Sequence, residues 1–459
     1  LKLNQLSMKE VVRHIEPLLA DCDVIGISTM TMESAILCHL SQAIREKTGK
    51  PVIMGGIGAI LDPEPCLKYA DWICLTEAEG VLLPGLEAAT GRYSRALPPG
   101  WLSRSSNGKY QISDLKENLD DFPPPDFDML DDWIMGENLE LVQVDRDMRK
   151  TVFSRFSHIK HADGSPVYTY VLMTTRGCPH KCTYCSNALF LDLFKGKGKV
   201  FRMRSAEYAV NEVVNVIRKY PYINFINIYD DTFTSRPDLE ELTRLYSKEV
   251  GLPFCNMVSP TTINEKKADL LSKAGAVQFQ MGVQTGSSRV LKTVYRRPGT
   301  RESILRATRI LGRYAHRTLP RYDFILDNPY ETAEDHRETI DLLSRISKPF
   351  RIQHFSLVFF RKTELYSRAK ADGILTPEMT GEKKRMSKWA NLHSFKLIDL
   401  CVIASPFVPA CMLRVVAKKP VFTILNSTVL RRALLFLALT ARRLIFKFKM
   451  GGTRFNDKK

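Results

Sequence analysis

Strand-like and helix-like segments alternate along most of this 459-residue chain, in two separate runs. In the first run, between residues 8 and 90, helical patterns such as MKEVVRHIEPLLADC alternate with short apolar segments such as DVIGIST and PVIMGG. Strands that alternate with helices form parallel sheets, which bind ligands beyond the carboxyl ends of their strands. The first run therefore predicts an α/β domain with a doubly wound, Rossmann-like sheet.

The second run begins near Tyr168 and contains about six strand–helix units. Its strand-like segments are VYTYVLMTTRG, INFINIYDD, FCNMVSP, VQFQMGVQTG, RYDFILDNPYET and RIQHFSLVFF. A complete barrel of this kind needs about eight units, and its chemistry lies at the ends of the strands. The second run thus predicts a partial (β/α)6, TIM-like barrel.

These patterns predict four segments. They are a first domain over 1–95, a linker over 96–165, the partial barrel over 166–370 and a helical, basic C-terminal region over 371–459. The linker is predicted from clustered Pro, Asp, Ser and Gly in ALPPGWLSRSSNGKY and DDFPPPDFDMLDD. The chain opens LKLNQLSMKE, with no initiator Met, signal peptide or long apolar run. We therefore expect a cytoplasmic protein whose first domain is truncated at its N-terminus.

The basic residues gather at the end of the chain, whose formal net charge is +17. From Leu413 onward twelve Lys or Arg stand against one acid, Asp457. Between Thr428 and Lys449 the charges recur at helical spacing and leave a Leu, Phe and Ile face, which predicts an amphipathic helix. Two interpretations stay open, a helix docked on a domain and a peripheral membrane contact. Nucleic acid is not an expected partner, because no binding module is recognisable.

Three cysteines lie close together in RGCPHKCTYCSN, namely Cys178, Cys182 and Cys185. Thiolates bind both zinc and iron–sulfur clusters. A structural zinc site takes four ligands, and His180 would be a crowded fourth inside one short loop. A [4Fe–4S] cluster can instead be held by three thiolates with one iron left open. The spacing therefore favours a cluster over zinc or inert thiols. Elsewhere, the irregular spacing of the cysteines predicts reduced, buried thiols and no second cluster.

The cysteine motif, followed along the chain by further matches, resembles the radical S-adenosylmethionine (SAM) superfamily over most of residues 166–370. The matches are CxxxCxxC after a first strand, then RMRSAEYAVNEV, IYDDTF, GVQTGSSRVLKTVYRR, DFILDNPYET and KTELYSRAKADG. The resemblance implies that the three cysteines hold a [4Fe–4S] cluster whose open iron binds SAM. It also implies SAM contacts at Tyr184, Asp230, Asp231, Gln284, Ser287 and Ile325. Two departures are Gln284, where the family usually has an acid, and Asp327, where it usually has Gly.

In the first domain, small or acidic residues follow three successive strand-like segments: Ser-Thr-Met, then Gly-Gly, then EAEG. Tight strand-to-helix turns alone would explain these residues. The arrangement, with the DDFPPP segment after it, also resembles a cobalamin-binding domain. That resemblance implies cobalamin contacts at Ser28, Thr29, Gly55, Gly56, Glu77 and Glu79. His14 lacks the neighbours of a lower ligand, so we expect base-off cobalamin with no protein histidine on the metal.

Together the two resemblances imply a cobalamin-dependent radical SAM enzyme. The simplest such activity is a C-methyltransferase that acts on an unactivated carbon through a 5′-deoxyadenosyl radical. The alternatives are a cyclase or ring-rearranging enzyme with the same cofactors, and a non-catalytic, zinc-stabilised binding protein. An external electron donor of the flavodoxin or ferredoxin type and a small-molecule substrate are expected partners. The basic, apolar tail favours a lipid-like substrate. No catalytic side chain is predicted, since the cofactors carry the chemistry.

Overall fold

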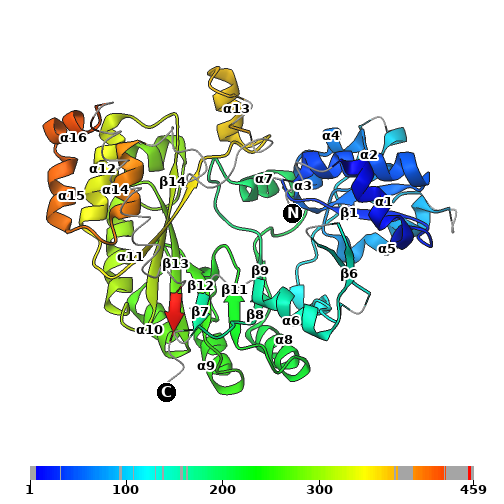
Figure 1. Cartoon of the computed structure of the whole chain (residues 1–459), viewed down its shortest axis with the longest axis horizontal. Coiled ribbons are helices and arrows are strands. Elements are labelled where there is room, and N and C mark those ends of the chain that lie inside the picture. Colours follow the sequence, from blue (N-terminus) through cyan, green and yellow to red (C-terminus); the bar gives the residue numbers. More distant parts are fainter. Residues whose placement is uncertain are drawn as a thin grey trace. The chain divides into compact units, whose positions relative to one another are not determined.

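The computed structural model divides the chain into two compact units (Figure 1). The first unit comprises Leu1–Arg149, Tyr184–Val200 and Val358–Lys384, and the second comprises Lys150–Thr183, Phe201–Leu357 and Arg385–Lys459. The structure describes residues 7–31, 33–91, 96–106, 108–129, 131–136, 139–155, 159–161, 164–376, 379–380, 396–427, 430 and 453–455.

The first unit contains a four-stranded sheet in the order β1 (Ile25–Ser28), β2 (Val52–Gly55), β3 (Trp72–Cys74) and β4 (Trp101–Ser103). The first three strands are parallel, and β4 pairs antiparallel with β3. Apolar side chains of the central strands, such as Val52, Met54 and Ile73, are fully buried and form the core of this unit. The helices are α1 (Met8–Leu19), α2 (Ser34–Thr48), α3 (Gly56–Leu61), α4 (Pro63–Leu67) and α5 (Leu82–Ala89).

The described strands confirm the α/β class that the sequence predicted and contain no switch point of a doubly wound sheet. A doubly wound sheet reverses its strand order at a switch point, whereas the described strands follow one another as β1, β2, β3 and β4. The alternation of strand-like and helix-like segments specifies parallel pairing but not the direction of each crossover. The first unit is therefore an α/β layer with its strands in sequential order.

Three segments outside residues 1–95 also belong to the first unit, namely 96–149, Tyr184–Val200 and Val358–Lys384. The strand β4 lies inside the stretch that was predicted as a linker. That stretch also contains the hairpin of β5 (Trp133–Met135) and β6 (Leu141–Gln143), and the helix α6 (Arg146–Arg155). The segment Val358–Lys384, with helix α13 (Glu364–Ala371), joins the first unit through Lys362, whose Nζ lies 2.8 Å from the Glu64 carboxylate.

The second unit is built on six parallel strands in sequential order, as the prediction of a partial barrel requires (Figure 1). The strands are β8 (Thr169–Leu172), β11 (Phe225–Ile228), β12 (Phe254–Val258), β13 (Ala276–Gln284), β14 (Leu319–Leu326) and β15 (Arg351–Ser356). The helices between them are α8 (Ala206–Lys219), α9 (Leu239–Glu249), α10 (Glu265–Lys273), α11 (Arg301–Arg313) and α12 (Ala333–Ser344). Side chains of Ser205, Asn264, Thr300 and Thr332 cap the first turns of α8, α10, α11 and α12, which explains where these helices begin.

The two faces of this sheet differ in polarity. On β14, Tyr322, Phe324 and Leu326 are buried and apolar or aromatic, while the alternate residues Arg321 and Asp323 are charged. Successive side chains of a strand point to opposite faces, so the charged residues share one face. The apolar face packs against the helices, and we call the other one the open face, because several of its side chains on β13, β14 and β15 are only partly buried.

The described C-terminal region contains three short helices, α14 (Leu397–Ala404), α15 (Ala410–Ala417) and α16 (Lys419–Leu425), and the strand β16 (Thr453–Phe455), which pairs parallel with β7 (Ile159–His161). Helices α14 and α15 pack against α12. The amphipathic helix predicted between Thr428 and Lys449 lies outside the described residues, apart from Leu430. Among the described residues, no helix has both the length and the apolar content that crossing a membrane would require.

Asp335 joins the start of α12 to the loop that follows β13. Its carboxylate accepts hydrogen bonds from the Ser287 hydroxyl at 2.6 Å and from the Thr332 backbone N–H at 2.7 Å, and it pairs with Arg289 at 2.5 Å. Burial opposes the charge, but these donors outweigh it and hold the pKa of Asp335 well below its usual range. The charged carboxylate therefore stabilises the fold.

We expect Asp335→Asn to lower the free energy of unfolding by about 1–3 kcal/mol, because it weakens a buried, charge-assisted network. A lowered pKa contributes stability above the unfolded pKa of about 4, and that contribution is lost as pH falls toward the folded pKa. Urea unfolding followed by circular dichroism should thus show a gap between wild type and variant at pH 7 that narrows below pH 4. Asp269→Asn, which removes an exposed ion pair on α10, is the control and should change stability little.

Candidate active site

The loop with the three cysteines leaves the carboxyl end of β8, the first strand of the six-stranded sheet. It passes through β9 (Thr175–Arg176), which pairs antiparallel with β10 (Arg202–Met203), and turns at Gly177, whose φ is +76°. Only glycine adopts such a φ at little cost, so the turn explains this residue. Cys178 and Cys182 follow and are both buried.

The far end of the loop is tied to the segment after β13. The Thr183 hydroxyl donates to the Val294 carbonyl oxygen at 2.6 Å, and the Thr183 backbone N–H donates to the Tyr295 carbonyl oxygen at 2.9 Å. Thr183 is itself buried. Residues more than a hundred positions apart in the sequence thus hold the loop closed immediately after Cys182.

The third cysteine, Cys185, stands at the N-cap of α7 (Ser186–Leu193), and its side chain is partly buried. The division between the two units falls inside the loop, so Cys178 and Cys182 belong to the second unit, and Tyr184 and Cys185 to the first. Among the described residues, no three His, Cys, Asp or Glu side chains converge on one point as a single metal ion would require. A [4Fe–4S] cluster binds each thiolate through a different iron, so its ligands need not converge on one point as those of a single ion do.

Asp230, predicted as a SAM contact, turns its carboxylate to the entry of the cysteine loop. It accepts hydrogen bonds from the Thr174 backbone N–H at 2.7 Å, from the Thr175 backbone N–H at 3.0 Å and from the Thr174 hydroxyl. Asp230 is 1% exposed, and burial raises its pKa. The side chain therefore positions the loop, and its neighbour Asp231 is the exposed member of the pair.

Arg236 completes this arrangement from the turn after β11. Its guanidinium is fully buried and donates to the Thr174 hydroxyl at 2.9 Å and to the Arg204 carbonyl oxygen at 2.8 Å. The Asp238 carboxylate accepts two further hydrogen bonds from it, at 3.0 Å and 2.6 Å. A bidentate, buried pair of this kind is rigid, so the first turn of the loop has a fixed course. The sequence analysis did not identify Arg236. Its position shortly after the IYDDTF motif was the indication of a role that the sequence offered.

The other predicted SAM contacts lie at or near the carboxyl ends of β13 and β14. Gln284 ends β13, and Ile325 is the next-to-last residue of β14 with a partly buried side chain. Ser287, by contrast, is fully buried, and its hydroxyl donates to Asp335. The Ser287 hydroxyl is thus engaged inside the protein, whereas Gln284 and Ile325 lie on the open face or at its edge.

Two strand ends adopt strained backbone conformations. Gln284 has φ +71° and Asp327 has φ +60°, both in the left-handed region that residues other than glycine rarely adopt. At Gln284 the pairing of β13 with β14 also shifts its register. Such strain is of the order of 1 kcal/mol or more per residue and gathers at functional sites. Asp327 is the position where the resemblance pointed to Gly, and its φ explains that preference.

A group of polar side chains on the open face of the sheet was missed by the sequence analysis. Asp323 of β14 accepts a hydrogen bond from the Gln280 side-chain amide at 2.6 Å, and Arg321 donates to the oxygen of the same amide. Burial raises the pKa of Asp323 to about 6, and it lowers the pKa of Arg321. The signal was present in RYDFILD and VQFQMGVQ, where polar residues recur at every second position of otherwise apolar strands.

His180, inside the cysteine loop, has a buried Nε2 without a hydrogen-bond partner among the described residues. Burial lowers its pKa, and the positive charge of Arg297 lowers it further. Both effects favour the neutral form of the imidazole. Arg297 also donates to the Gly282 carbonyl oxygen at 2.8 Å, so it lies between the loop and the end of β13.

The residues predicted to bind cobalamin lie at the carboxyl ends of β1, β2 and β3. Thr29 is 1% exposed, and its hydroxyl donates to the Gly55 carbonyl oxygen at 3.0 Å, while Ser28 and Glu79 are exposed and Glu77 is partly buried. Gly56 has φ +80°, and a Cβ there would lie 2.6 Å from the Thr29 carbonyl oxygen. The tight turn itself therefore requires Gly56. Gly55 is under no such constraint, because its Cβ would meet nothing closer than 3.6 Å.

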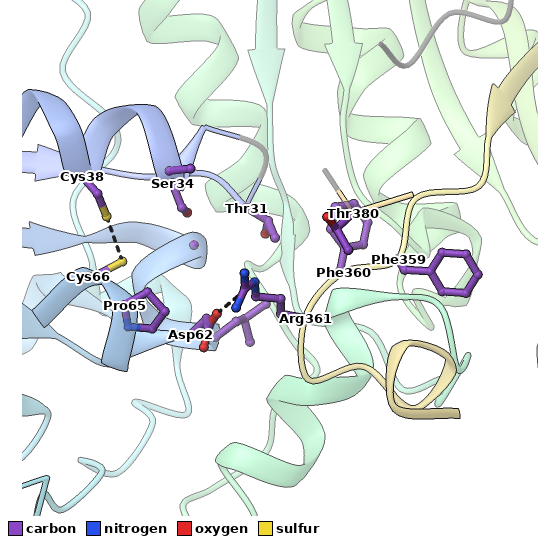
Figure 2. A pocket seen from close by; sticks show the side chains of 13 residues that line it. Thr31, Ser34, Cys38, Asp62, Pro65, Cys66, Phe359, Phe360, Arg361 and Thr380 are labelled. Carbon is purple, nitrogen blue, oxygen red and sulfur yellow. Dashed lines mark hydrogen bonds and ion pairs between the residues drawn. The ribbon is translucent and has the colours of Figure 1, made fainter. Parts of the chain in front are cut away.

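A pocket of about 110 Å³ lies in the first unit beside these strand ends (Figure 2). Its lining comes from the loop after β1, from α2 to α4 and from the segment 359–361. Asp62 pairs with Arg361 at 3.8 Å along one wall, and burial raises the pKa of Asp62. The thiols of Cys38 and Cys66 lie 3.9 Å apart along another. The pocket could hold one end of a planar ligand but not a whole corrin ring.

Comparison with known proteins identifies the family of the middle part of the chain. Residues 172–343 match the family model described as the Radical SAM superfamily. These residues form a radical SAM domain. The radical SAM domain includes the cysteine loop and four of the six parallel strands, β11 to β14, together with the last residue of β8 and all but the last residue of α12. The prediction of a radical SAM domain in this chain is thereby confirmed.

Named relatives extend beyond the radical SAM domain. The chain is 26% identical over 315 residues to cytidylyl-2-hydroxyethylphosphonate methyltransferase of Streptomyces wedmorensis, a match that covers 64% of this chain and 56% of that protein. It is 26% identical over 388 residues to an uncharacterized methyltransferase of Pyrococcus horikoshii, covering 81% and 74%. The chain thus spans little more than half of the Streptomyces relative.

Solved structures share the fold of both the radical SAM domain and further parts of the chain. The radical SAM methyltransferase TsrM from Kitasatospora setae superimposes with a TM-score of 0.58 at 18% identity, covering 78% of this chain and 67% of that one. The cobalamin-dependent radical enzyme OxsB gives a TM-score of 0.56 at 17% identity, covering 80% and 49%. At these identities the likeness concerns the fold.

We expect Asp230→Ala to reduce iron binding by the radical SAM domain, because it leaves two buried backbone N–H groups of the cysteine loop without their acceptor, at a cost of about 1–3 kcal/mol each. Iron per chain after anaerobic reconstitution should fall well below the wild-type value. Asp231→Ala removes the exposed neighbour and should keep wild-type iron. Equal iron in both variants would show that Asp230 does not position the loop.

Proposed function

We propose that this chain is a cobalamin-dependent radical SAM methyltransferase that methylates an unactivated carbon. The observation that carries the proposal is the three-cysteine loop at the carboxyl end of the first strand of a six-stranded parallel sheet. The match to the radical SAM family supports the chemistry, and the two relatives named as methyltransferases support the reaction type.

In this proposal the protein's own residues place the cofactors and exclude water. Cys178, Cys182 and Cys185 hold a [4Fe–4S] cluster, while Asp230 and Thr183 fix the two ends of its loop. When bound, the cluster and SAM supply the reducing electron and the reactive carbon centre. Gln284 and Ile325 contact SAM at the ends of β13 and β14. The lowered pKa of His180 favours its neutral form inside the loop.

The first unit is the proposed cobalamin site. Support comes from the pocket beside the ends of β1 and β2, and from the exposed hydroxyl of Ser28 next to Gly56. TsrM and OxsB have both been solved with cobalamin bound, and both share this chain's fold. Glu77 and Glu79, with Gly55, are the further contacts that we propose. The strand-end turns alone do not decide the matter, since Gly56 is explained by its own packing.

Two further parts of the proposal concern partners. The cluster needs an electron from outside, which we assign to a donor of the flavodoxin or ferredoxin type. Peripheral membrane contact is supported by exposed apolar side chains of the C-terminal region. Phe407, in the turn between α14 and α15, is 68% exposed, Met412 of α15 is 55% exposed and Ile424 of α16 is 60% exposed. Exposed Lys418 and Lys419 lie between them in the sequence and would suit anionic lipids.

A cyclase or ring-rearranging enzyme with the same cofactors is the competing activity, and the mass of the product distinguishes the two. Methylation adds about 14 Da to the substrate, with the methyl group derived from SAM. Turnover with methyl-deuterated SAM should therefore move deuterium into the product. A product of unchanged mass would favour rearrangement.

Replacing a cluster ligand tests the proposed chemistry directly. We expect Cys182→Ser to lose most of about four irons per chain and all reductive formation of 5′-deoxyadenosine from SAM, because one thiolate ligand is removed. Iron analysis and mass spectrometry of the nucleoside check the two results. Cys411→Ser, an exposed thiol on α15, is the control and should leave both unchanged. Wild-type iron and nucleoside in the Cys182 variant would contradict the proposal.

Filling the pocket of the first unit tests the cobalamin site. Ala35 lines this pocket from the first turn of α2 and is exposed, so Ala35→Phe fills it without disturbing the core. We expect the variant to retain less than about half of the wild-type cobalamin after reconstitution, since the aromatic ring occupies space needed by the ligand. The corrin absorbance after gel filtration measures the loading.

The matched control for this experiment is Gln42→Phe, two turns further along the same helix. Gln42 is exposed and does not line the pocket. It should bind cobalamin as the wild type does. Equal loading of both variants would place cobalamin elsewhere, and no loading of the wild type would remove cobalamin from the proposal.

A further inference from the structure

Two cysteine side chains of the first unit lie against each other in the wall of its pocket (Figure 2). Cys38 belongs to α2 and Cys66 to α4, and their Sγ atoms are 3.9 Å apart, close enough for a hydrogen bond between the thiols. Twenty-eight residues separate the two in the sequence, and their spacing does not indicate a pair. The packing of α2 against α4 therefore brings the two sulfur atoms together.

Both thiols are buried, yet both line a cavity that reaches the surface. Cys38 is 4% exposed and Cys66 is 1% exposed, and the pocket beside them measures about 110 Å³. Ala35, which is exposed, lines the same pocket one turn earlier on α2. A cavity of this size has room for a small group of atoms, so a small reagent can approach the sulfur atoms from solvent. Access of this kind separates reactive cysteines from inert buried ones.

The contact between the sulfur atoms makes one thiol a better nucleophile than the other. As a thiolate, Cys38 accepts a hydrogen bond from the Cys66 thiol, which lowers the pKa of Cys38 and raises the pKa of Cys66. Burial and the negative charge of Asp62 oppose the thiolate, but the hydrogen bond is the larger effect on Cys38. The thiolate is the reactive form of cysteine, so Cys38 is the sulfur that attacks first.

We propose that Cys38 and Cys66 are a redox pair, which forms a reversible disulfide in the wall of the pocket and thereby limits the entry of the pocket's ligand. The disulfide follows from the contact between the two sulfur atoms, and the identity of the ligand as cobalamin rests on the function proposed above. Reduced thiols are the state that the sequence predicted. In a reducing compartment a disulfide of this kind is transient and serves to sense the redox state.

The oxidant is a low-molecular-weight disulfide, and the reaction is a thiol–disulfide exchange in two steps. The Cys38 thiolate attacks one sulfur of the small disulfide, forms a mixed disulfide and displaces the other half as a thiolate. The Cys66 sulfur, after losing its proton to solvent, then attacks the Cys38 sulfur and displaces the second half. The two protein thiols lose two electrons and two protons in all, and the small disulfide becomes two thiols.

Closing the bond links the two helices that line the pocket. The sulfur atoms are 3.9 Å apart in the reduced pair and about 2 Å apart in a disulfide, a difference that rotation of the cysteine side chains can cover. The pocket is smaller than a corrin ring, so α2 and α4 have to move apart as cobalamin enters. A covalent link between the helices opposes that movement.

A redox titration of the reconstituted chain tests the pair. The chain is equilibrated without oxygen in buffers of reduced and oxidised glutathione, quenched in acid, alkylated after denaturation and digested. Mass spectrometry with fragmentation of the peptides then assigns each sulfur. We expect peptides joined through Cys38 and Cys66 to hold more than about half of these residues in the most oxidising buffer, and to disappear when dithiothreitol is added.

Cys74 is the internal control, because it is equally buried in the same unit and its thiol faces the Thr76 carbonyl oxygen at 3.7 Å. It should be alkylated in every buffer. Glutathione bound to Cys38 or Cys66 without a bond between them would overturn the pair. So would two free thiols at every glutathione ratio.

Cobalamin loading, measured by corrin absorbance, tests the effect on the pocket. Glutathione is first removed by gel filtration, because it also binds cobalamin. We expect the oxidised wild type to load at least about threefold less cobalamin than the reduced wild type, and dithiothreitol to restore the loading. Cys38→Ser cannot form the bond, so its loading should be the same after either buffer. Cys66→Ser replaces this variant if Cys38→Ser does not fold.

The two measurements separate the failure of this inference from the failure of the proposed function. A disulfide that forms without changing the cobalamin loading of the wild type would overturn the effect on the pocket. A wild type that binds no cobalamin after either buffer would overturn the cobalamin site, and with it the control of that site. The joined peptides would still establish the redox pair in that case.

Discussion

The hydrogen bonds between the Asp230 carboxylate and the backbone of Thr174 and Thr175 are the interaction on which the rest of the second unit's site depends. They join the end of β11 to the point where the chain leaves β8 and enters the cysteine loop. The fully buried Arg236 donates hydrogen bonds to the Thr174 hydroxyl and to the Arg204 carbonyl oxygen. A loop of mostly polar residues has few apolar contacts of its own to stabilise it, so its course is imposed by these buried polar partners. The cysteines can therefore be presented at the end of the first strand without a second metal-binding segment.

The two faces of this sheet carry different kinds of side chain. Its helix-covered face is apolar and provides the stability, while its open face carries Gln280, Arg321 and Asp323, which a folded protein would not bury without a use for them. The strained φ angles of Gln284 and Asp327 occur at the edge of the same face.

The sequence predicted the strands and helices that local patterns determine. It did not predict features that depend on contacts between residues far apart in the chain. The six strands and the helices between them follow from periodicity and from capping residues such as Thr300 and Thr332. The sequential strand order of the first unit could not be predicted, because crossover direction depends on packing and not on the pattern. Ser287 was predicted as a SAM contact. Its hydroxyl donates to Asp335 inside the protein, and no local sequence pattern indicates that hydrogen bond. Arg321 and Asp323 could have been found from their two-residue spacing on a buried strand.

The most direct test of the central claim is electron–nuclear double resonance of the reduced, anaerobically purified chain with SAM labelled with ¹⁵N in its amino group. Three cysteine ligands leave one iron of a [4Fe–4S] cluster open, so the account predicts a hyperfine coupling between the cluster spin and the labelled nitrogen. The coupling should vanish when unlabelled SAM replaces the labelled compound. A reduced cluster spectrum with no nitrogen coupling, or a chain that binds zinc and no iron, would contradict the account.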